Sequence, residues 1–515
     1  MYRKVDPTPN PPSNFDLPFE GQLLEDNRWV IMAKLIPWSA FEAEYAQNFS
    51  VDMGDPAKSF RMALGALIIK ERLGTSDRET IEQIRENPYL QYFIGMTSYS
   101  SQAPFDSSML VHFRQRIGVN LVNKINEKMV KEQTEAPGKV VDKKSSDISE
   151  PKNQGKLILD ATCAPADIKY PNDLGILNQA REQTETIIDA LHTQIQSPVK
   201  KKPRTYRNLA RKEYLTVAKK RRPSQKKRRK AIKKQLQYIK RNLAHIEAMG
   251  ELTWLNKYYY KMLLVVTEVY RQQLWMYENK THSIEDRIVS LTQPHIRPIV
   301  RGKAGKSVEF GAKLLASCRN GYVFLDRISW DNFNESVDLK KQQVEEFKRF
   351  TGFYPKSIHV DRIYRTRSNR AWCQEKGIRM SGPSLGRPPT NISKSTKKQA
   401  QSDERIRNSI EGKFGEAKRR FSLGKVMAKL SNTSGTAIAI TFLVMNLSSL
   451  LRQAFWLFFC LFHNKNFCLG FLALKMRNNY VLSKKNEDNL YFSDNSKFTH
   501  LSKGCFQTFS ASPIY

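Results

Sequence analysis

The sequence predicts an α/β domain that is interrupted by a long basic helical insertion and preceded by an all-helical domain. Three observations predict this class. Short apolar runs that end in a carboxylate alternate with helical patterns through the second half of the chain. A strongly basic helical stretch separates the first of these runs from the others, and helical periodicity dominates the chain before the first run.

Composition indicates the kind of partner. The chain has 515 residues and a formal net charge of +35, with 85 Lys and Arg against 50 Asp and Glu. This surplus favours a polyanionic partner, with nucleic acid ahead of an acidic membrane surface. The six cysteines contain no C-x-x-C pair, which argues against a disulfide framework or a Cys-rich zinc site and fits a reducing cytoplasm. Residues 1–16 have no apolar core, so no signal peptide is expected.

The N-terminal part reads as an irregular arm, residues 1–28, followed by a helical domain, residues 29–130. Residues 60–70 form an apolar helix, Asp77 opens a second helix, and Asp106 can cap a third. Short helices joined by tight turns suit a helix-turn-helix DNA reader, but they suit a helical packing or dimerisation domain equally well.

A polar linker, residues 131–156, leads to a buried strand that ends at Asp160. The helical insertion then covers about residues 174–300, and within it residues 200–241 hold 20 Lys or Arg and one acid, Glu213. A solvated face is the usual explanation of a charge run, but this density favours binding to DNA phosphates. The densest stretch is Lys226, Lys227, Arg228, Arg229 and Lys230.

After the insertion, strands and helices alternate. The predicted elements are a hairpin (307–315 and 321–328), a helix (338–351), a strand (357–361), a helix (367–376), a strand (378–381), a polar loop (382–403) and a long helix from Glu404. Asn320-Gly321 is a strong hairpin-turn signal. Without its insertion, the order matches a ribonuclease-H-like α/β domain.

Three carboxylates are the candidate catalytic groups. Asp160 and Asp361 end predicted strands, where open α/β sheets hold their ligands. On the last helix, Arg407, Glu411 and Lys418 share one stripe, because a helix turns about 100° per residue. The alternatives are strand-end caps for the two aspartates and an ordinary surface Arg–Glu pair for the helix.

This residue set suits phosphodiester chemistry. Two Mg²⁺ ions about 3.5–4 Å apart can activate the attacking oxygen and stabilise the leaving one. Mg²⁺ takes oxygen ligands, and Mn²⁺ is a plausible substitute. Asp160 would bridge the ions, with Asp361 and Glu411 on either side. The side chains expected to contact phosphate are Arg407, Lys418 and Lys413.

These motifs resemble the DDE transposases of bacterial insertion sequences, in particular the fifth insertion-sequence family. The matching stretches are Leu157–Thr162, Val360–Tyr364, Ser381–Pro388, an R-x3-E-x6-K pattern over Arg407–Lys418, and the N-terminal helices from about Phe60 to Gly118. The resemblance covers about residues 15–452. It implies a ribonuclease-H-like catalytic domain over residues 157–452, Mg²⁺ dependence and cut-and-paste movement of a DNA element.

The same resemblance implies the partners. The N-terminal helical domain would bind terminal inverted repeats of double-stranded DNA, and a homodimer would pair the two ends. The catalytic triad carries over to Asp160, Asp361 and Glu411. The protein would then act in the bacterial cytoplasm, associated with the nucleoid.

Two positions depart from the family. Glu404 stands where the family usually has Tyr, and the resemblance ends near Arg452, before a tail of residues 453–515. A decayed, inactive DNA-binding protein and a nuclease without strand transfer are therefore the alternatives. Residues 302–307 lack the first Gly of a phosphate-binding P-loop, which argues against ATP binding. Residues 437–451 predict a buried helix rather than a membrane span.

Overall fold

The structure is a computed structural model. It describes residues 15–17, 21–50, 55–134, 153–194, 201–250, 252–303, 306–382 and 393–462. Met1–Gln453 form one compact unit and Ala454–Tyr515 another. Most of the predicted linker (131–156) and tail (453–515) lies outside the described residues. The same holds for residues 383–388 of the motif Ser381–Pro388.

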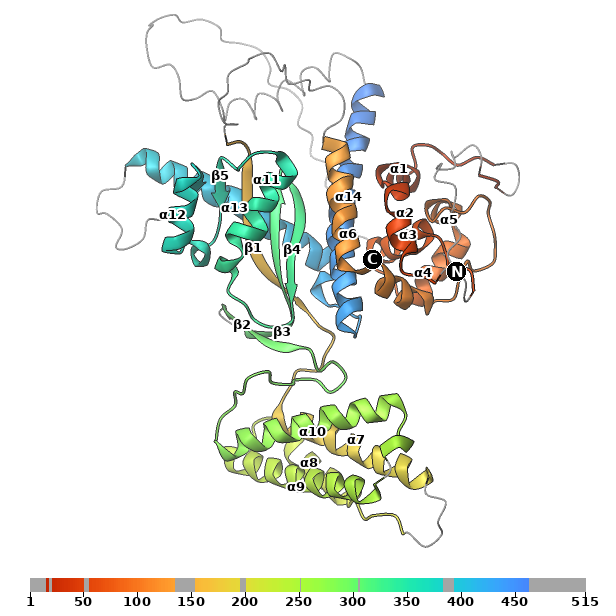
Figure 1. Cartoon of the computed structure of the whole chain (residues 1–515), viewed down its shortest axis with the longest axis vertical. Helices are drawn as coiled ribbons and strands as arrows, with labels where there is room; N and C mark the ends of the chain where they lie inside the picture. Colours follow the sequence, from red (N-terminus) through yellow and green to blue (C-terminus); the bar gives the residue numbers. More distant parts are fainter. Residues whose placement is uncertain are drawn as a thin grey trace, which may run out of the picture. The chain divides into compact units, whose positions relative to one another are not determined.

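A six-stranded mixed sheet forms the centre of the first unit (Figure 1). Its strands are β1 (Lys156–Pro165), β2 (Arg297–Lys303), β3 (Lys306–Arg319), β4 (Tyr322–Ser329), β5 (Ser357–His359) and β6 (Arg379–Met380). β3 pairs antiparallel with β1, β2 and β4, whereas β5 runs parallel to β1 and β6. The chain is therefore of the α/β class, as the sequence predicts.

The predicted hairpin is confirmed. Asn320 and Gly321 both have positive φ angles, 52° and 87°, which is the backbone that a type I′ turn requires and that Asn-Gly adopts readily. Close pairing continues at Gly311, where a Cβ atom would lie 2.1 Å from the carbonyl oxygen of Ala164. Only glycine allows β1 and β3 to approach in this way.

Two predictions about strands were wrong. The start of β2 was predicted to belong to the helical insertion. Its Arg, Pro and Lys residues do not show the apolar pattern of a strand, and its Val300 is 64% exposed. β1 does not end at Asp160 but continues to Pro165, since its second half pairs with Gly311–Leu315 of β3. Asp160 therefore lies within a strand, and only Asp361 lies just past the end of one.

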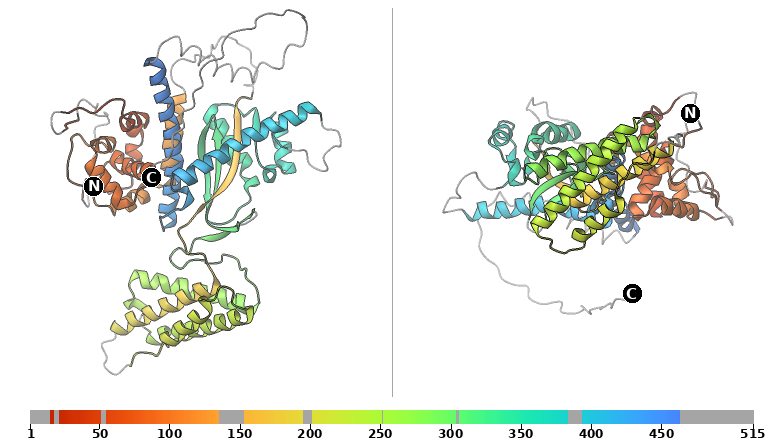
Figure 2. Two further views of the ribbon diagram at one scale, coloured as in Figure 1. Left: turned by 180° about the vertical axis from the view of Figure 1, so that it is seen from behind. Right: turned by 90° about the horizontal axis from the view of Figure 1, so that it is seen from below.

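Helices follow the strands in the predicted order. They are α11 (Glu345–Thr351), entered through a π-helical turn over Leu339–Val344, α12 (Arg367–Glu375) and α13 (Lys394–Arg420). α13 begins at Lys394, so the predicted loop over 382–403 was wrong in its second half. The first turns of α13 are polar and exposed, and they carry no apolar stripe from which a helix could be predicted. Figure 2 shows α13 crossing a face of the sheet, and it packs on β1 and β5.

The insertion between β1 and β2 is a set of four packed helices (Figure 1). They are α7 (Asp173–Gln194), α8 (Arg207–Ala218), α9 (Gln225–Met249) and α10 (Lys257–Glu278). They bury their own apolar clusters, which include Leu177, Ile239 and Val266. The basic run thus lies on helices that already have a packed inner face.

The N-terminal region is helical, as predicted. Its helices are α1 (Arg28–Leu35), α2 (Glu42–Ala46), α3 (Phe60–Leu73), α4 (Asp77–Glu86), α5 (Pro88–Phe93) and α6 (Met109–Thr134). α4 begins at Asp77, and the side chain of Ser76 caps it by accepting from the backbone N–H of Glu79. Gly118 kinks α6 with a φ angle of 69°.

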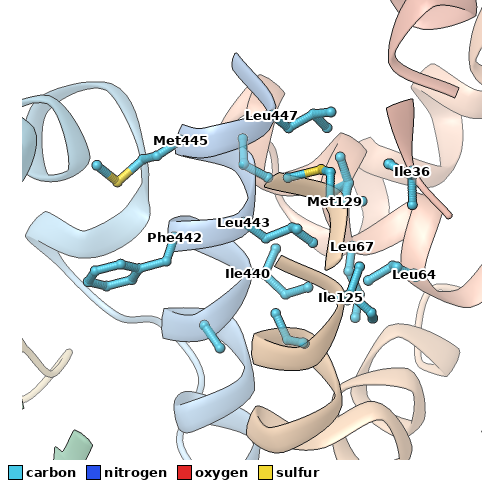
Figure 3. Close-up of a cluster of buried hydrophobic side chains, with 14 of the residues drawn as sticks. Ile36, Leu64, Leu67, Ile125, Met129, Ile440, Phe442, Leu443, Met445 and Leu447 are labelled. Atoms are coloured by element: carbon cyan, nitrogen blue, oxygen red, sulfur yellow. The ribbon is translucent and has the colours of Figure 1, made fainter. Parts of the chain in front are cut away.

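Helix α14 (Ser431–Phe462) joins the N-terminal helices to the sheet. It is the one helix among the described residues that is long and apolar enough to cross a membrane, over Ser431–Trp456, and 89% of its apolar window is buried in the protein. Figure 3 shows Leu443 and Leu447 of α14 facing α6 and α3, with Phe442 and Met445 on another side. The prediction of a buried helix is confirmed.

Buried polar groups within α14 have partners. The Nδ2 atom of Asn446 donates to the carbonyl of Val323 on β4 at 2.8 Å and to Oδ1 of Asn126 on α6 at 3.0 Å. The Thr441 hydroxyl donates to Glu71 of α3 at 2.6 Å. These bonds fix how α14 sits between the sheet and the N-terminal helices, because unpaired polar groups there would cost free energy.

Candidate active site

One cavity of about 780 Å³ brings the three predicted carboxylates together. Asp160 comes from β1, Asp361 follows β5 and Glu411 comes from α13, and all three line its wall. The residues lie 50 to 251 positions apart in the sequence, so only the fold can place them at one site.

The strand register explains the first two positions. In the parallel pair of β1 and β5, Ile158 lies opposite His359. Asp160 and Asp361 each lie two residues beyond this last recorded pair, Asp160 still within β1 and Asp361 just past the end of β5. Asp361 also caps the turn that follows, because its Oδ1 accepts from the backbone N–H of Arg362 at 2.6 Å.

Helix α13 supplies the other wall. Ile410 and Phe414 bury its apolar stripe, and Arg407, Glu411 and Lys418 line the cavity, as the predicted stripe requires. Lys413 does not line the cavity, because its Nζ lies 3.3 Å from the Ser449 hydroxyl of α14. The structure thus places Lys413 apart from Arg407 and Lys418, and its contact with DNA phosphate stays a prediction.

Arg407 is held between two carboxylates of its own helix. Its guanidinium lies 2.7 Å from Glu404 and 2.9 Å from Glu411. The hydrogen bonds to these carboxylates raise the pKa of Arg407 above its ordinary value, with Glu404 as the largest cause. The residue that replaces the usual family Tyr thus neutralises part of the charge that Arg407 could offer to a phosphate.

The basic stretch of the insertion lies at the start of α9. Lys226, Lys227, Arg228 and Lys230 are exposed there, and none of them lines the carboxylate cavity. Arg229 differs from its neighbours, because it lies over the ring of Tyr277 and donates to the Tyr277 carbonyl at 2.9 Å. It therefore helps to pack α9 against α10.

Sequence reasoning missed Glu335 and Lys313, which line the same cavity. Glu335 opens a short 3-10 helix, Glu335–Val337, and Lys313 lies on β3. Their side chains form an ion pair at 3.0 Å and are only 15% and 12% exposed. The available signal was weak: an acid in a polar stretch shortly after the second strand of the hairpin.

Asp160 has an unusual environment. The pKa of its carboxyl is raised to about 6, chiefly by burial and also by the negative charges of Glu335 and Glu411, while the hydrogen bond from Ala161 N–H and the charge of Arg407 oppose this rise. The folded protein therefore holds a proton on Asp160 between about pH 4 and pH 6, where the unfolded chain does not.

Asp160→Asn should therefore stabilise the protein in the absence of divalent cations. The buried negative charge is removed, which should raise the free energy of unfolding at pH 8 by about 2 kcal/mol. The gain should shrink as the pH falls through 6 and vanish below about pH 4, where Asp160 is neutral in both states. Urea unfolding at pH 8, 6 and 4 measures it, and a gain that is equal at all three values would contradict the assigned cause.

The donor set of the cavity fits a hard divalent cation, because it consists of carboxylate oxygens. Among the described residues, however, no group of three or more His, Cys, Asp and Glu already has the arrangement of a metal site. Arg407 engages Glu411, and Lys313 engages Glu335. Side-chain rotation away from these bases would have to accompany cation binding.

Comparisons with known proteins support the predicted resemblance to transposases. Residues 358–448 match the family model of the transposase DDE domain, and residues 18–116 match that of a transposase domain (DUF772). The chain is also similar to the uncharacterized protein ORF8 in the nfe locus of Rhizobium meliloti, with 30% identity over 144 residues. That match covers 28% of this chain and 64% of the relative. No solved structure matches the chain.

The DDE match contains Asp361, Glu411 and the basic residues Arg407 and Lys418 of the cavity wall. The second match covers most of the N-terminal helices. The resemblance to the DDE transposases is thereby confirmed, and two regions of the chain match family models of transposase domains.

Proposed function

We propose that this protein is a DNA transposase of the fifth insertion-sequence family, which cleaves phosphodiesters at the ends of its element and joins the freed 3′-hydroxyl to target DNA. The observation that carries the proposal is the single cavity lined by Asp160, Asp361 and Glu411. Arg407 and Lys418 on its wall provide positive charge for phosphate oxygens.

The topology of the sheet supports a ribonuclease-H-like domain. Pairing gives the order β4-β3-β1-β5-β6, with an antiparallel hairpin on one side of β1 and parallel strands on the other. The helices follow in the matching order, and α7 to α10 interrupt the domain between β1 and β2. The first carboxylate lies on the central strand, and the second follows its parallel neighbour.

In this proposal Asp160, Asp361 and Glu411 would hold Mg²⁺. The chemistry that bound Mg²⁺ supplies is activation of the attacking oxygen and stabilisation of the charge on the leaving oxygen. Lys418 binds the DNA phosphate beside these carboxylates. Arg407 also binds this phosphate after its guanidinium exchanges Glu411 for a phosphate oxygen. The ion pair with Glu404 holds the Arg407 guanidinium at the cavity wall.

The N-terminal helices would recognise the terminal inverted repeats, and two copies of the chain would pair the ends. The transposase-domain match over residues 18–116 supports a role of this region in transposition. A bacterial cytoplasmic, nucleoid-associated protein follows from the same proposal.

The test is incubation of the purified protein with duplexes that carry the element's own ends, with Mg²⁺, with Mn²⁺ and with EDTA. We expect cation-dependent nicks at the repeat boundary that leave 3′-hydroxyls, and joined products when target DNA is added. Nicks without joined products would favour the nuclease. Binding without nicks under either cation would favour the decayed DNA-binding protein and would count against the proposed chemistry.

The insertion would bind DNA backbone through the exposed bases at the start of α9. Replacing Lys226, Lys227, Arg228 and Lys230 together by Gln should weaken DNA binding for every sequence, because phosphate contacts carry no sequence information. The slope of log affinity against log salt should become shallower by about 3 to 4. Fluorescence anisotropy between 50 and 300 mM salt measures it.

Arg229→Gln is the matched control for this charge effect. It should change the salt slope by less than about one and lower the melting temperature instead, because Arg229 packs on Tyr277. If the fourfold variant had the salt slope of the wild type, these four residues of the insertion would not contact DNA.

A further inference from the structure

Glu335 and Lys313 lie in the wall of the carboxylate cavity, outside the predicted triad. Lys313 is held tightly, because its Nζ lies 3.0 Å from Glu335, 2.7 Å from the carbonyl of Phe333 and 3.1 Å from Oδ1 of Asn332. The pair is mostly buried. A buried ion pair adds little net stability over an apolar pair, because both charges lose their hydration. Its position beside Asp160 suggests a functional reason for it.

A second observation comes from Tyr364. Its side chain is fully buried at 0% exposure, and its hydroxyl has no hydrogen-bond partner among the described residues. Tyr364 lies on the 3-10 turn Arg362–Tyr364, which packs against the Glu335–Val337 turn. Burial is the largest cause that raises the pKa of Tyr364 well above its ordinary value, followed by the negative charges of Glu335 and Asp160. A buried hydroxyl without a partner is costly. A hydrated cation beside these carboxylates would give it a water to bond, since Mg²⁺ usually keeps several waters.

We propose that Glu335 is a fourth carboxylate of the cation site and that Lys313 is the positive charge which the cation displaces from it. The proposal rests on the proposed function of the cavity. In the cation-free protein the ammonium of Lys313 neutralises Glu335. On cation binding Glu335 turns toward Asp160, and Lys313, which keeps its bonds to the 332–333 loop, becomes available to a DNA phosphate.

If the divalent cation and the Lys313 ammonium compete for the Glu335 carboxylate, substitutions of Lys313 and Glu335 should change the affinity for the divalent cation in opposite directions. Removing the carboxylate must weaken cation binding, whereas removing the competing ammonium must strengthen it. A purely structural role of the pair predicts the same direction for both changes, because each would loosen the same wall of the cavity.

The experiment is Mn²⁺ titration of the full, DNA-free chain, followed by electron paramagnetic resonance of free Mn²⁺. Glu335→Gln should raise the dissociation constant about tenfold or more. Lys313→Met, which keeps an unbranched apolar side chain against Phe333, should lower it severalfold. Asp331→Asn is the control: it removes one negative charge from the same loop, but its side chain is 72% exposed and does not line the cavity.

An unchanged dissociation constant in Glu335→Gln, or a rise in both variants, would overturn the proposal. If Glu335→Gln failed to fold, Lys313→Met would still have to bind Mn²⁺ more tightly, and unchanged or weaker binding would overturn it. Asp361→Asn distinguishes a failure of the proposed function of the cavity from a failure of the proposed role of Glu335. Loss of Mn²⁺ binding in Asp361→Asn but not in Glu335→Gln would leave the proposed function standing and remove Glu335 from the site.

Discussion

Asp361→Asn is expected to reduce the rate of Mg²⁺-dependent DNA cleavage by about 10³-fold or more. A carboxylate that holds a catalytic cation accounts for several kcal/mol of transition-state stabilisation, and each 1.36 kcal/mol is a factor of ten. DNA affinity should change little, because Asp361 contributes no positive charge. Single-turnover cleavage of labelled element ends measures the rate, and anisotropy measures the affinity.

This substitution separates chemistry from folding. Asp361 is exposed, and its side chain caps the turn at Arg362. Asparagine can accept the same hydrogen bond without the charge, so the melting temperature should stay within a few degrees of the wild type. Glu375→Gln is the matched control, because this acid of α12 is 66% exposed and lies outside the cavity wall. Wild-type cleavage rates in Asp361→Asn would eliminate the proposed triad.

How far such a site can be predicted from sequence differs between its parts. Arg407, Glu411 and Lys418 could be assigned to one face, because helix geometry is local and regular. The same arithmetic places Lys413 about 200° from Glu411, which explains why it reaches α14 instead. Asp160 and Asp361 were recognisable as acids after apolar runs, and the parallel register of β1 and β5 brings them together.

Glu335 could not be predicted in this way. It follows no apolar run and shares no helix with another acid, and its partner Lys313 lies on a different strand. Its place in the site results from the hairpin of β3 and β4, which returns the chain to the side of Asp160. The start of α13 is exposed and polar, so burial leaves no periodic pattern in it, and the edge strand β2 has only the apolar pair Ile299 and Val300 between basic residues and Pro298.

The core around α14 is where the largest loss of stability is expected. Leu443 is fully buried and faces α6 and α3 (Figure 3). Leu443→Ala should lower the free energy of unfolding by about 2–5 kcal/mol, because the surrounding helices are fixed by bonds such as Thr441–Glu71 and cannot close the cavity. Urea unfolding measures the loss. The control is Phe455→Ala on the same helix, which should cost clearly less because Phe455 is 39% exposed.

The same variant tests how the two matched regions are coupled. α14 contributes to one apolar cluster with the N-terminal helices, with β3 and β4, and with Ile410 and Phe414 of α13. Those two α13 residues underlie the stripe that carries Glu411, so loosening of α14 should reach the catalytic wall as well as the N-terminal helices. We therefore expect Leu443→Ala to lose tryptophan fluorescence, to which the buried N-terminal Trp29 and Trp38 contribute, and Mn²⁺ binding in one transition of urea. Two separate transitions would mean that the N-terminal helices and the α/β domain unfold independently.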